Sequence, residues 1–543
     1  MKNLVLIFGC ILLTLSCKMK KSVDLILHNA IIYSMDNDMS VFSAIAVKDG
    51  LIVELADDNT ILDKYKSQSI VDLEGLFLYP GFNDSHGHLS SLGQSLNQVD
   101  LRGVTSMDQL VDRVLQYRQD NPDIKYIYGF GWDQNLWDIK KVSNSTLNSV
   151  IDDIPVVLYR VDLHSVLVNN KAIDSLSIYP GCKSIPAGEA VIEGGAFTGE
   201  FLEGTADRFR SVISEPSEQD IANFILSAQQ ECFKLGLTSV SSAGSDYLTT
   251  KVYKDLQDKG LLKIRTDLWI SPDKENLDGF SKPYISDRLR IATLKLFADG
   301  ALGSRGAWLL EPYSDNRATY GVPVMDSLKF RELCNWAVER GFNVATHCIG
   351  DAANRFVLDE YGKILKGKND LRWRVEHAQI ISPDDLDKFG QFSIIPSIQP
   401  THATSDMGWV ADRLGDRERN AYIFRELLDQ NGWLPTGTDF PIEDVNPLFT
   451  FISAVFRTDS NLLPEGGYMI NSALTREEAL LSMTLWGAKA TFEESVKGSL
   501  EPGKYADFTL LNCDLLKAPL TEIAQSKVIA TYVAGQSLYS LLP

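Results

Sequence analysis

Two histidines, His86 and His88, are separated by one residue and follow a largely apolar run after three polar residues. The run, residues 78–82, contains a Pro-Gly pair and is typical of a β-strand that passes through a kink. Side chains at positions i and i+2 of a strand point to the same face, so both imidazoles can bind one metal ion. The spacing therefore predicts a metal site at the end of this strand.

A lysine inside an apolar run, Lys295 in residues 291–298, is the second unusual feature. Burying an unpaired ammonium group is costly, so this lysine requires either a charge partner or a covalent modification. Addition of carbon dioxide to its amine would give a carbamate, an anionic oxygen ligand able to bridge two metal ions. An ion pair with Asp299 or another carboxylate is the alternative that the sequence leaves open.

Three more residues with metal-binding side chains, His347, His377 and Asp439, follow predicted strands. Four of the seven histidines in the chain thus stand at strand ends, where scattered surface histidines would have no reason to gather. In an α/β barrel the carboxyl ends of all strands meet at one face, and active sites are built there. We therefore expect these residues to converge.

The elements that would position them fit an α/β fold, a (β/α)8 TIM barrel over residues 81–496. Strand-like runs alternate with helical patterns, of which 330–340 and 476–490 are clear examples. A long gap between the first two strands predicts an insertion after strand 1, at about 89–230. The eight expected barrel strands are 78–86, 237–242, 263–270, 291–298, 343–347, 372–377, 393–398 and 434–438.

Both ends of the chain are rich in short strands joined by polar turns. Both segments, 23–80 and 497–543, show this pattern of short apolar runs and polar turns. Lys48-Asp49-Gly50, for example, is typical of a hairpin turn. We expect the two ends to form one small composite β-sandwich.

The first residues read as an export signal. Lys2 precedes an apolar run, residues 4–15, which is too short to span a bilayer, and Cys17 follows. Residues 13–17 resemble a bacterial lipoprotein box, so we expect a leader over 1–17 and lipidation at Cys17, with an ordinary secretory leader as the alternative. We expect the mature protein to lie in the periplasm or on a membrane surface. Its contact with the membrane would be through this lipid anchor alone.

The composition indicates which classes of partner the protein can bind. A formal net charge of −20 repels phosphate backbones and anionic lipids, which argues against nucleic acid as a partner. A small-molecule substrate is expected instead, and assembly into a homo-oligomer stays open. The five cysteines after the leader form no Cys-x-x-Cys pair and are expected to be buried thiols.

Taken together, the motifs resemble the amidohydrolase superfamily, and their finer pattern is similar to its YtcJ-like branch. The resemblance covers residues 23–543 and rests on five ordered motifs. These are Asp84-Ser85-His86-Gly87-His88, Lys295-Leu296-Phe297-Ala298-Asp299-Gly300, His347-Cys348-Ile349-Gly350-Asp351, Glu376-His377-Ala378-Gln379 and Gly437-Thr438-Asp439-Phe440-Pro441.

The resemblance implies a metal-dependent hydrolase in which metal-activated hydroxide cleaves a non-peptide carbon–nitrogen bond. One or two divalent ions, expected to be zinc, would be held by six side chains, with Asp439 also moving the proton. The six implied ligands are His86, His88, carbamylated Lys295, His347, His377 and Asp439.

Four residues outside this set are candidates for binding substrate. His164 and His402 occupy positions that resemble ones kept beside the pocket in the YtcJ-like branch. Arg305 lies in a Gly-rich loop that is either a substrate loop or an ordinary connection. Trp132 either lines an apolar pocket, together with Trp137, or packs inside the insertion.

Three other functions are alternatives. Ester or lactone cleavage is the nearest, because the same hydroxide attacks either carbonyl. A heterocycle deaminase is less favoured, since such relatives usually carry a glutamate shortly after the histidine of strand five, where this chain has Cys348-Ile349-Gly350-Asp351. A non-catalytic periplasmic binding protein would need neither Lys295 nor Asp439.

Overall fold

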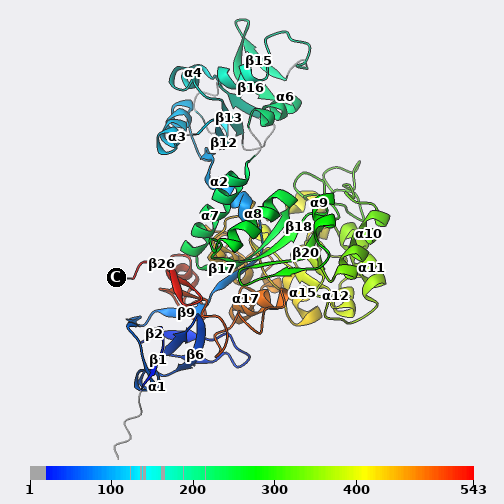
Figure 1. Ribbon diagram of the computed structural model, residues 1–543. Coiled ribbons are helices and arrows are strands. Elements are labelled where there is room, and N and C mark those ends of the chain that lie inside the picture. The colour runs from blue at the N-terminus through cyan, green and yellow to red at the C-terminus, as the bar shows by residue number, and fades with distance from the viewer. Residues whose placement is uncertain are drawn as a thin grey trace, which may run out of the picture. The chain divides into compact units, whose positions relative to one another are not determined.

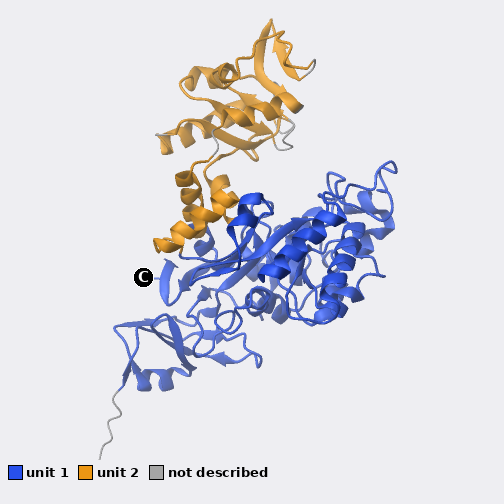
Figure 2. Cartoon of the chain, turned by 45° about the vertical axis from the view of Figure 1, so that its right-hand side comes forward, with its two compact units in different colours: residues 1–87, 230–245, 263–543 blue, residues 88–229, 246–262 orange. Residues whose placement is uncertain are grey.

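The computed structural model describes residues 20–122, 124–134, 137, 142–160, 165–186, 189–213 and 216–542. Cys17 and His164 lie outside the described residues. The chain forms two compact units (Figure 2). The first comprises Met1–Gly87, Gln230–Ser245 and Lys263–Pro543, and the second comprises His88–Gln229 and Asp246–Leu262.

The first unit contains a parallel barrel with helices around its strands (Figure 1). Seven strands pair side by side in chain order, and the short β19 (Tyr284–Ile285) adds an antiparallel pair at the start of the fourth. The seven are β10 (Phe82–Gly87), β17 (Leu237–Ser245), β18 (Arg265–Ile270), β20 (Leu289–Phe297), β21 (Asn343–Cys348), β22 (Arg374–His377) and β23 (Ile395–Ser397).

The eighth predicted strand, 434–438, closes the barrel without forming a regular strand. Its Thr436 makes a parallel bridge to Ile398, just past β23, and on the other side its carbonyl accepts the Ser85 N–H at 3.0 Å. The backbone N–H of Asp439 then donates to the His86 carbonyl at 2.7 Å. The fold class predicted from the sequence is therefore confirmed.

The first predicted strand, 78–86, is in fact two strands. β9 (Phe77–Pro80) belongs to the sandwich, and β10 begins the barrel after Gly81. A Cβ at Gly81 would lie 2.2 Å from the Thr238 side chain, so only glycine lets the backbone change sheets at this point.

The helices of this unit begin and end on ordinary capping signals. Asp326 caps α10 by accepting the N–H groups of Leu328 and Lys329, and Gly341 ends it with φ +74°. The predicted helix 476–490 is two helices, α17 and α18, separated at Thr484. The bounds are α9 Lys274–Gly279, α10 Ser327–Arg340, α11 Asp351–Leu365, α12 Asp387–Phe392, α13 Pro400–Asp406, α14 Val410–Leu414, α15 Phe424–Asn431, α16 Pro447–Val455, α17 Arg476–Ser482, α18 Leu485–Ala490 and α19 Leu520–Ile523.

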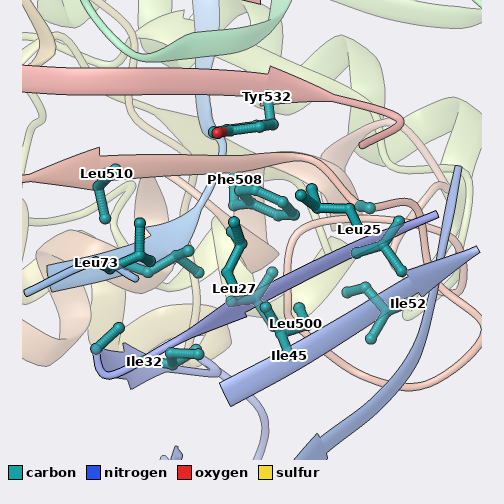
Figure 3. Packing of buried hydrophobic residues seen from close by; sticks show 14 of the residues in the cluster. Leu25, Leu27, Ile32, Ile45, Ile52, Leu73, Leu500, Phe508, Leu510 and Tyr532 are labelled. Atoms are coloured by element: carbon teal, nitrogen blue, oxygen red, sulfur yellow. The ribbon is translucent and has the colours of Figure 1, made fainter. Parts of the chain in front are cut away.

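Both chain ends meet in a β-sandwich, as expected. One sheet has the order β6-β5-β2-β8, and the other, β26-β25-β24-β9-β3-β4, joins the last three strands of the chain to early ones. Leucine, isoleucine and phenylalanine side chains of both sheets form its core (Figure 3). The bounds are β2 Leu25–His28, β3 Ile31–Tyr33, β4 Val41–Phe42, β5 Ala44–Lys48, β6 Leu51–Ala56, α1 Asp58–Lys64, β8 Ser69–Asp72, β24 Phe508–Leu511, β25 Val528–Val533 and β26 Gln536–Ser540; β1 Lys21–Ser22 pairs with β7 Tyr65–Lys66.

A buried ion pair joins the sandwich to the barrel. Arg265, at the start of β18, donates from Nε and Nη2 to the carboxylate of Asp507 at 2.5 and 3.1 Å. Its guanidinium also lies 3.6 Å from the centre of the Tyr505 ring. A bidentate buried pair of this kind is costly to break, because either partner alone would be a buried charge.

The second unit is a separate α/β layer structure with its own cores. Its six-stranded sheet has the order β11-β12-β13-β14-β16-β15. The bounds are α2 Leu89–Leu96, β11 Val99–Asp100, α3 Met107–Asp120, β12 Ile127–Trp132, α4 Ser145–Val150, β13 Val156–Arg160, β14 Ser165–Val168, α5 Asn170–Ser175, β15 Ala190–Glu193, β16 Ala196–Leu202, α6 Glu203–Arg208, α7 Glu218–Lys234, which runs into the first unit, and α8 Tyr247–Asp258.

Two sequence expectations concern the whole chain. Among the helices of the described residues, none combines the length and apolar character needed to cross a bilayer. The five cysteines after the leader are free, and four of them are buried, whereas Cys182 is partly exposed.

Candidate metal centre

Three side chains converge where barrel strands end. His86 comes from β10, His377 from the last position of β22, and Asp439 from the loop after the closing segment. Their ligand atoms lie within 4.8 Å of one another, and all three residues are buried. His377 and Asp439 have φ of +70° and +64°, which is uncommon outside glycine and typical of functional sites.

The hydrogen bonds of His86 determine which nitrogen faces the centre. Its Nδ1–H donates to Glu376 Oε2 at 2.6 Å, in a pair with no more than 1% of either side chain exposed. The other nitrogen, Nε2, is therefore an acceptor in the neutral ring, and it lies 3.4 Å from Asp439 Oδ1. Two acceptors that face each other at this distance suit a cation placed between them.

Two more imidazole nitrogens support the same interpretation. Within the described residues, His347 Nε2 and His377 Nδ1 are buried without a hydrogen-bond partner. The two rings lie 4.5 Å apart between centroids, and the His377 ring lies 5.1 Å from that of His86. A buried nitrogen without a hydrogen bond is costly, and a metal ion would satisfy it.

The protonation states also fit metal binding. Burial, with the nearby Lys295 charge, lowers the pKa of His86 to about 4 and that of His347 to about 3. Burial and the neighbouring His347 lower the pKa of His377 well below its usual value. All three rings are neutral near pH 7, which is the form that binds metal. The donor set therefore fits a divalent ion.

Lys295 points into the same region from β20. It is 1% exposed, and its Nζ lies 4.8 Å from the centre of the Phe297 ring. Burial lowers its pKa to about 8, although Glu376 and Asp439 oppose this shift. Asp299, the partner considered from sequence, instead accepts backbone N–H groups of Trp308, Ile349 and Gly350 at 2.8–3.0 Å.

His88, the second histidine of the motif, begins the other compact unit. It stands at the N-terminus of α2, where its carbonyl accepts the Leu92 N–H at 2.8 Å. Its part in the metal centre stays a prediction.

The supporting residues Arg374 and Glu376 were not assigned roles from sequence. Arg374 Nε donates to Glu376 Oε1 at 2.7 Å, and Arg374 Nη2 donates to the Ser85 carbonyl at 2.8 Å. Arg374 and the charges around it hold the pKa of Glu376 at about 2, against the opposing effect of burial. The sequence did contain a signal for this ion pair. Two opposite charges stand two residues apart in an otherwise apolar strand, so their side chains lie on the same face.

His402, from α13, lies against Asp439. Its Nε2 is 3.2 Å from Asp439 Oδ2, and its Nδ1 is 3.2 Å from Glu443 Oε1. Burial alone would lower its pKa, but the hydrogen bonds to the two carboxylates outweigh this and raise it to about 10. His402 is therefore an imidazolium that donates from both nitrogens. Sequence reasoning missed Glu443, which follows the Asp439 motif in the same loop.

The other substrate-binding candidates are Arg305, Trp132 and His164. Arg305 pairs with Asp315 through Nε at 3.1 Å and Nη2 at 2.8 Å, and the same carboxylate also accepts a hydrogen bond from Arg413, so the substrate role of Arg305 stays a prediction. Trp132 has no exposed surface, donates from Nε1 to the Leu158 carbonyl at 2.7 Å and packs against Trp137. Packing in the core of the insertion, the alternative left open from sequence, accounts for these contacts of Trp132, and its substrate role stays a prediction. His164 lies outside the described residues.

Comparison with known proteins supports a metal centre independently of its geometry. The family model described as "Amidohydrolase family" matches residues 69–539. The chain is 30% identical to the putative amidohydrolase YtcJ of Bacillus subtilis, over 94% of this chain and 98% of that protein. It is 24% identical to an N-substituted formamide deformylase of Arthrobacter pascens, over 95% and 98%. The crystal structure of an uncharacterized metal-dependent hydrolase of Pyrococcus furiosus matches with a TM-score of 0.76 and 33% identity, over 91% of this chain and 99% of that chain.

Proposed function

This chain belongs to the amidohydrolase family, and from that premise we propose that it hydrolyses a non-peptide amide bond with the help of bound zinc. The observation that carries the proposal is the gathering of His86, His377 and Asp439 ligand atoms within 4.8 Å. Imidazole and carboxylate ligands in an open site suit zinc.

The metal would be held by His86, His377 and Asp439, with His88, His347 and Lys295 as the further ligands expected from the motifs. When bound, such an ion polarises a carbonyl and makes hydroxide available near neutral pH. One or two ions are compatible with this donor set.

The protein's own groups would orient the ligands and move protons. Glu376 accepts the Nδ1–H of His86 and so keeps Nε2 directed at the centre. Asp439 would take a proton on a carboxylate oxygen from the attacking water and pass it to the leaving nitrogen. His402 donates to the Asp439 carboxylate and would hold it in place for this transfer.

Lys295 would take part as a carbamate. A lowered pKa leaves a larger fraction of neutral amine, which is the form that adds carbon dioxide. The product would be an anion near Glu376 and Asp439, and the bound divalent ion would supply the positive charge that compensates it.

The substrate class is drawn from a relative. The Arthrobacter pascens protein is named an N-substituted formamide deformylase and matches nearly the whole chain. We therefore expect N-formyl or other N-acyl amines to be the substrates.

The experiment uses the chain without residues 1–17. Zinc is measured by elemental analysis, and hydrolysis is followed on a series of N-formyl and N-acyl amines, with the matching esters in parallel. Bound zinc and faster turnover of amides are expected. Protein that binds no metal contradicts the proposal, and turnover of the esters alone assigns the site to ester or lactone cleavage. Asp439→Asn is the inactive control.

We also propose that the protein is exported and lipidated at Cys17. The support is the apolar run followed by Ser16-Cys17. Expression in a bacterium fed a labelled fatty acid should label the wild type and leave Cys17→Ala unlabelled. Equal labelling of both proteins would contradict the anchor.

A further inference from the structure

His402 is held from both sides by carboxylates of one loop. Asp439 Oδ2 lies 3.2 Å from its Nε2, and Glu443 Oε1 lies 3.2 Å from its Nδ1. The histidine itself comes from α13, which follows a different barrel strand. A ring held at both nitrogens can neither rotate about χ2 nor exchange the two nitrogens without breaking a hydrogen bond.

Glu443 is in turn held for this contact. Ser405 Oγ–H, one turn along α13 from His402, donates to the same Oε1 atom at 2.6 Å. In the described part of the chain, Glu443 accepts hydrogen bonds from these two side chains and from no backbone amide. Glu443 therefore does not cap a helix or stabilise its own loop, which are the ordinary structural uses of a loop carboxylate.

The contact between Glu443 and His402 is partly exposed to solvent. About one fifth of the Glu443 side chain is exposed, against 15% for His402 and 10% for Asp439. A hydrogen bond that faces water this openly adds little to folding stability. Its more specific effect is geometric, since it determines which way the His402 ring faces.

We propose that Glu443 is a positioning residue, which holds His402 so that Nε2–H is directed at the Asp439 carboxylate and the reacting groups beside it. The inference rests on the proposed function, because it gives Glu443 its effect through His402 on a base that acts in amide hydrolysis. Carboxylates that orient metal-binding imidazoles typically matter by about 10- to 100-fold, and we expect an effect of this size for His402.

The first test detects the hydrogen bond between His402 and Glu443 without measuring turnover. Selective ¹⁵N-histidine labelling of the whole enzyme gives signals from only seven residues. The two His402 ring N–H signals are those absent in His402→Ala, and couplings to the ring C–H protons distinguish Nδ1 from Nε2. Glu443→Ala should lose the exchange-protected Nδ1–H signal, whereas Glu443→Gln should keep it, because the amide oxygen still accepts. Asp444→Asn is the matched control: it removes a neighbouring exposed charge, and its Oδ1 acceptor for Asn446 N–H is retained. A protected signal that survives in Glu443→Ala overturns the proposal.

The second test reads the effect on the reaction. Glu443→Ala should lower kcat by about 10- to 100-fold with zinc content unchanged, and Glu443→Gln should recover most of the loss. In a His402→Ala background, Glu443→Ala should cost nothing more, since the two residues act as a unit. An equal loss in that background, or a change in KM alone, overturns the proposal. If the wild type hydrolyses no amide, the proposed function fails, and the labelling test still decides the role of Glu443.

Discussion

Gly437 lies where the closing segment of the barrel passes the first strand, and its replacement by alanine tests how the centre is built. A Cβ at this position would lie 2.4 Å from the backbone nitrogen of His86 and 2.8 Å from its Cβ and carbonyl oxygen. Ordinary contacts of this kind are 3.4–4 Å. The methyl group therefore forces the segment away from β10 by about 1 Å, since neither backbone can give way locally.

The cost follows from the contacts that this shift disturbs. Overpacking against backbone costs about 1–3 kcal/mol. The hydrogen bonds Asp439 N–H to His86 O, at 2.7 Å, and Ser85 N–H to Thr436 O, at 3.0 Å, are stretched in addition, at about 0.5–1.5 kcal/mol each. We expect Gly437→Ala to be destabilised by about 2–6 kcal/mol. Displacing His86 from Asp439 by this amount should also lower turnover by about 100-fold.

The assay compares thermal unfolding of the metal-free wild type, Gly437→Ala and Gly408→Ala, followed by zinc binding and turnover. Gly408 is the matched control, because a Cβ there meets nothing within 4 Å and its φ is not in the left-handed region. The control should unfold and bind zinc as the wild type does. If Gly437→Ala also matches the wild type in unfolding temperature and zinc affinity, the close approach described here does not position the centre.

Three further changes test other parts of the structure. Lys295→Ala should lose zinc unless a short carboxylic acid is supplied to replace the carbamate; unchanged zinc content without the acid, by elemental analysis, would show that Lys295 is no ligand. Glu376→Gln should lower zinc affinity by about 10- to 100-fold, because an amide holds the Nδ1–H of His86 less strongly than a carboxylate; competition with a chelating dye measures this, and wild-type affinity would contradict it. Asp507→Asn should cost about 3–5 kcal/mol at pH 7, because Arg265 would keep only the more distant and solvent-exposed carboxylate of Asp287, 3.4 Å from its Nη1. Burial opposes ionisation of Asp507, but Arg265 lowers its pKa below the unfolded value, so this contribution is present above that value and is lost as the pH falls through the folded pKa. Urea unfolding at pH 7 and near pH 3 should therefore show the gap between wild type and variant shrinking in acid, and a gap that stays constant would refute the assignment.

The barrel was predictable because its strands are short apolar runs that end in chemically distinctive residues. Each predicted ligand of the barrel follows or interrupts such a run, so its residue type and its position both indicated a metal site. These residues are His86, Lys295, His347, His377 and Asp439. Strand order followed as well, since the seven strands from β10 to β23 pair in parallel with their neighbours in chain order.

What the sequence did not reveal depends on contacts between distant segments. The division of 78–86 into β9 and β10 occurs at Gly81, where the limit is the Thr238 side chain from another strand. The bond from Glu443 to His402 joins two loops, and no periodicity connects them. Trp132 was ambiguous for the same reason, because a tryptophan in a pocket wall and one in a core have the same local sequence.

The sandwich has a consequence for how the chain matures. β9, near its beginning, pairs with β3 on one side and with β24, near its end, on the other. Until β24 has been synthesised, one edge of β9 is free and the sandwich core lacks the apolar side chains of the late strands, such as Phe508, Leu510 and Tyr532, and pairing over such a separation is slow. Ribosome-bound chains that stop short of Phe508 should consequently be protease-sensitive within their first sixty or so residues after the leader, and release of the full chain should make that region resistant.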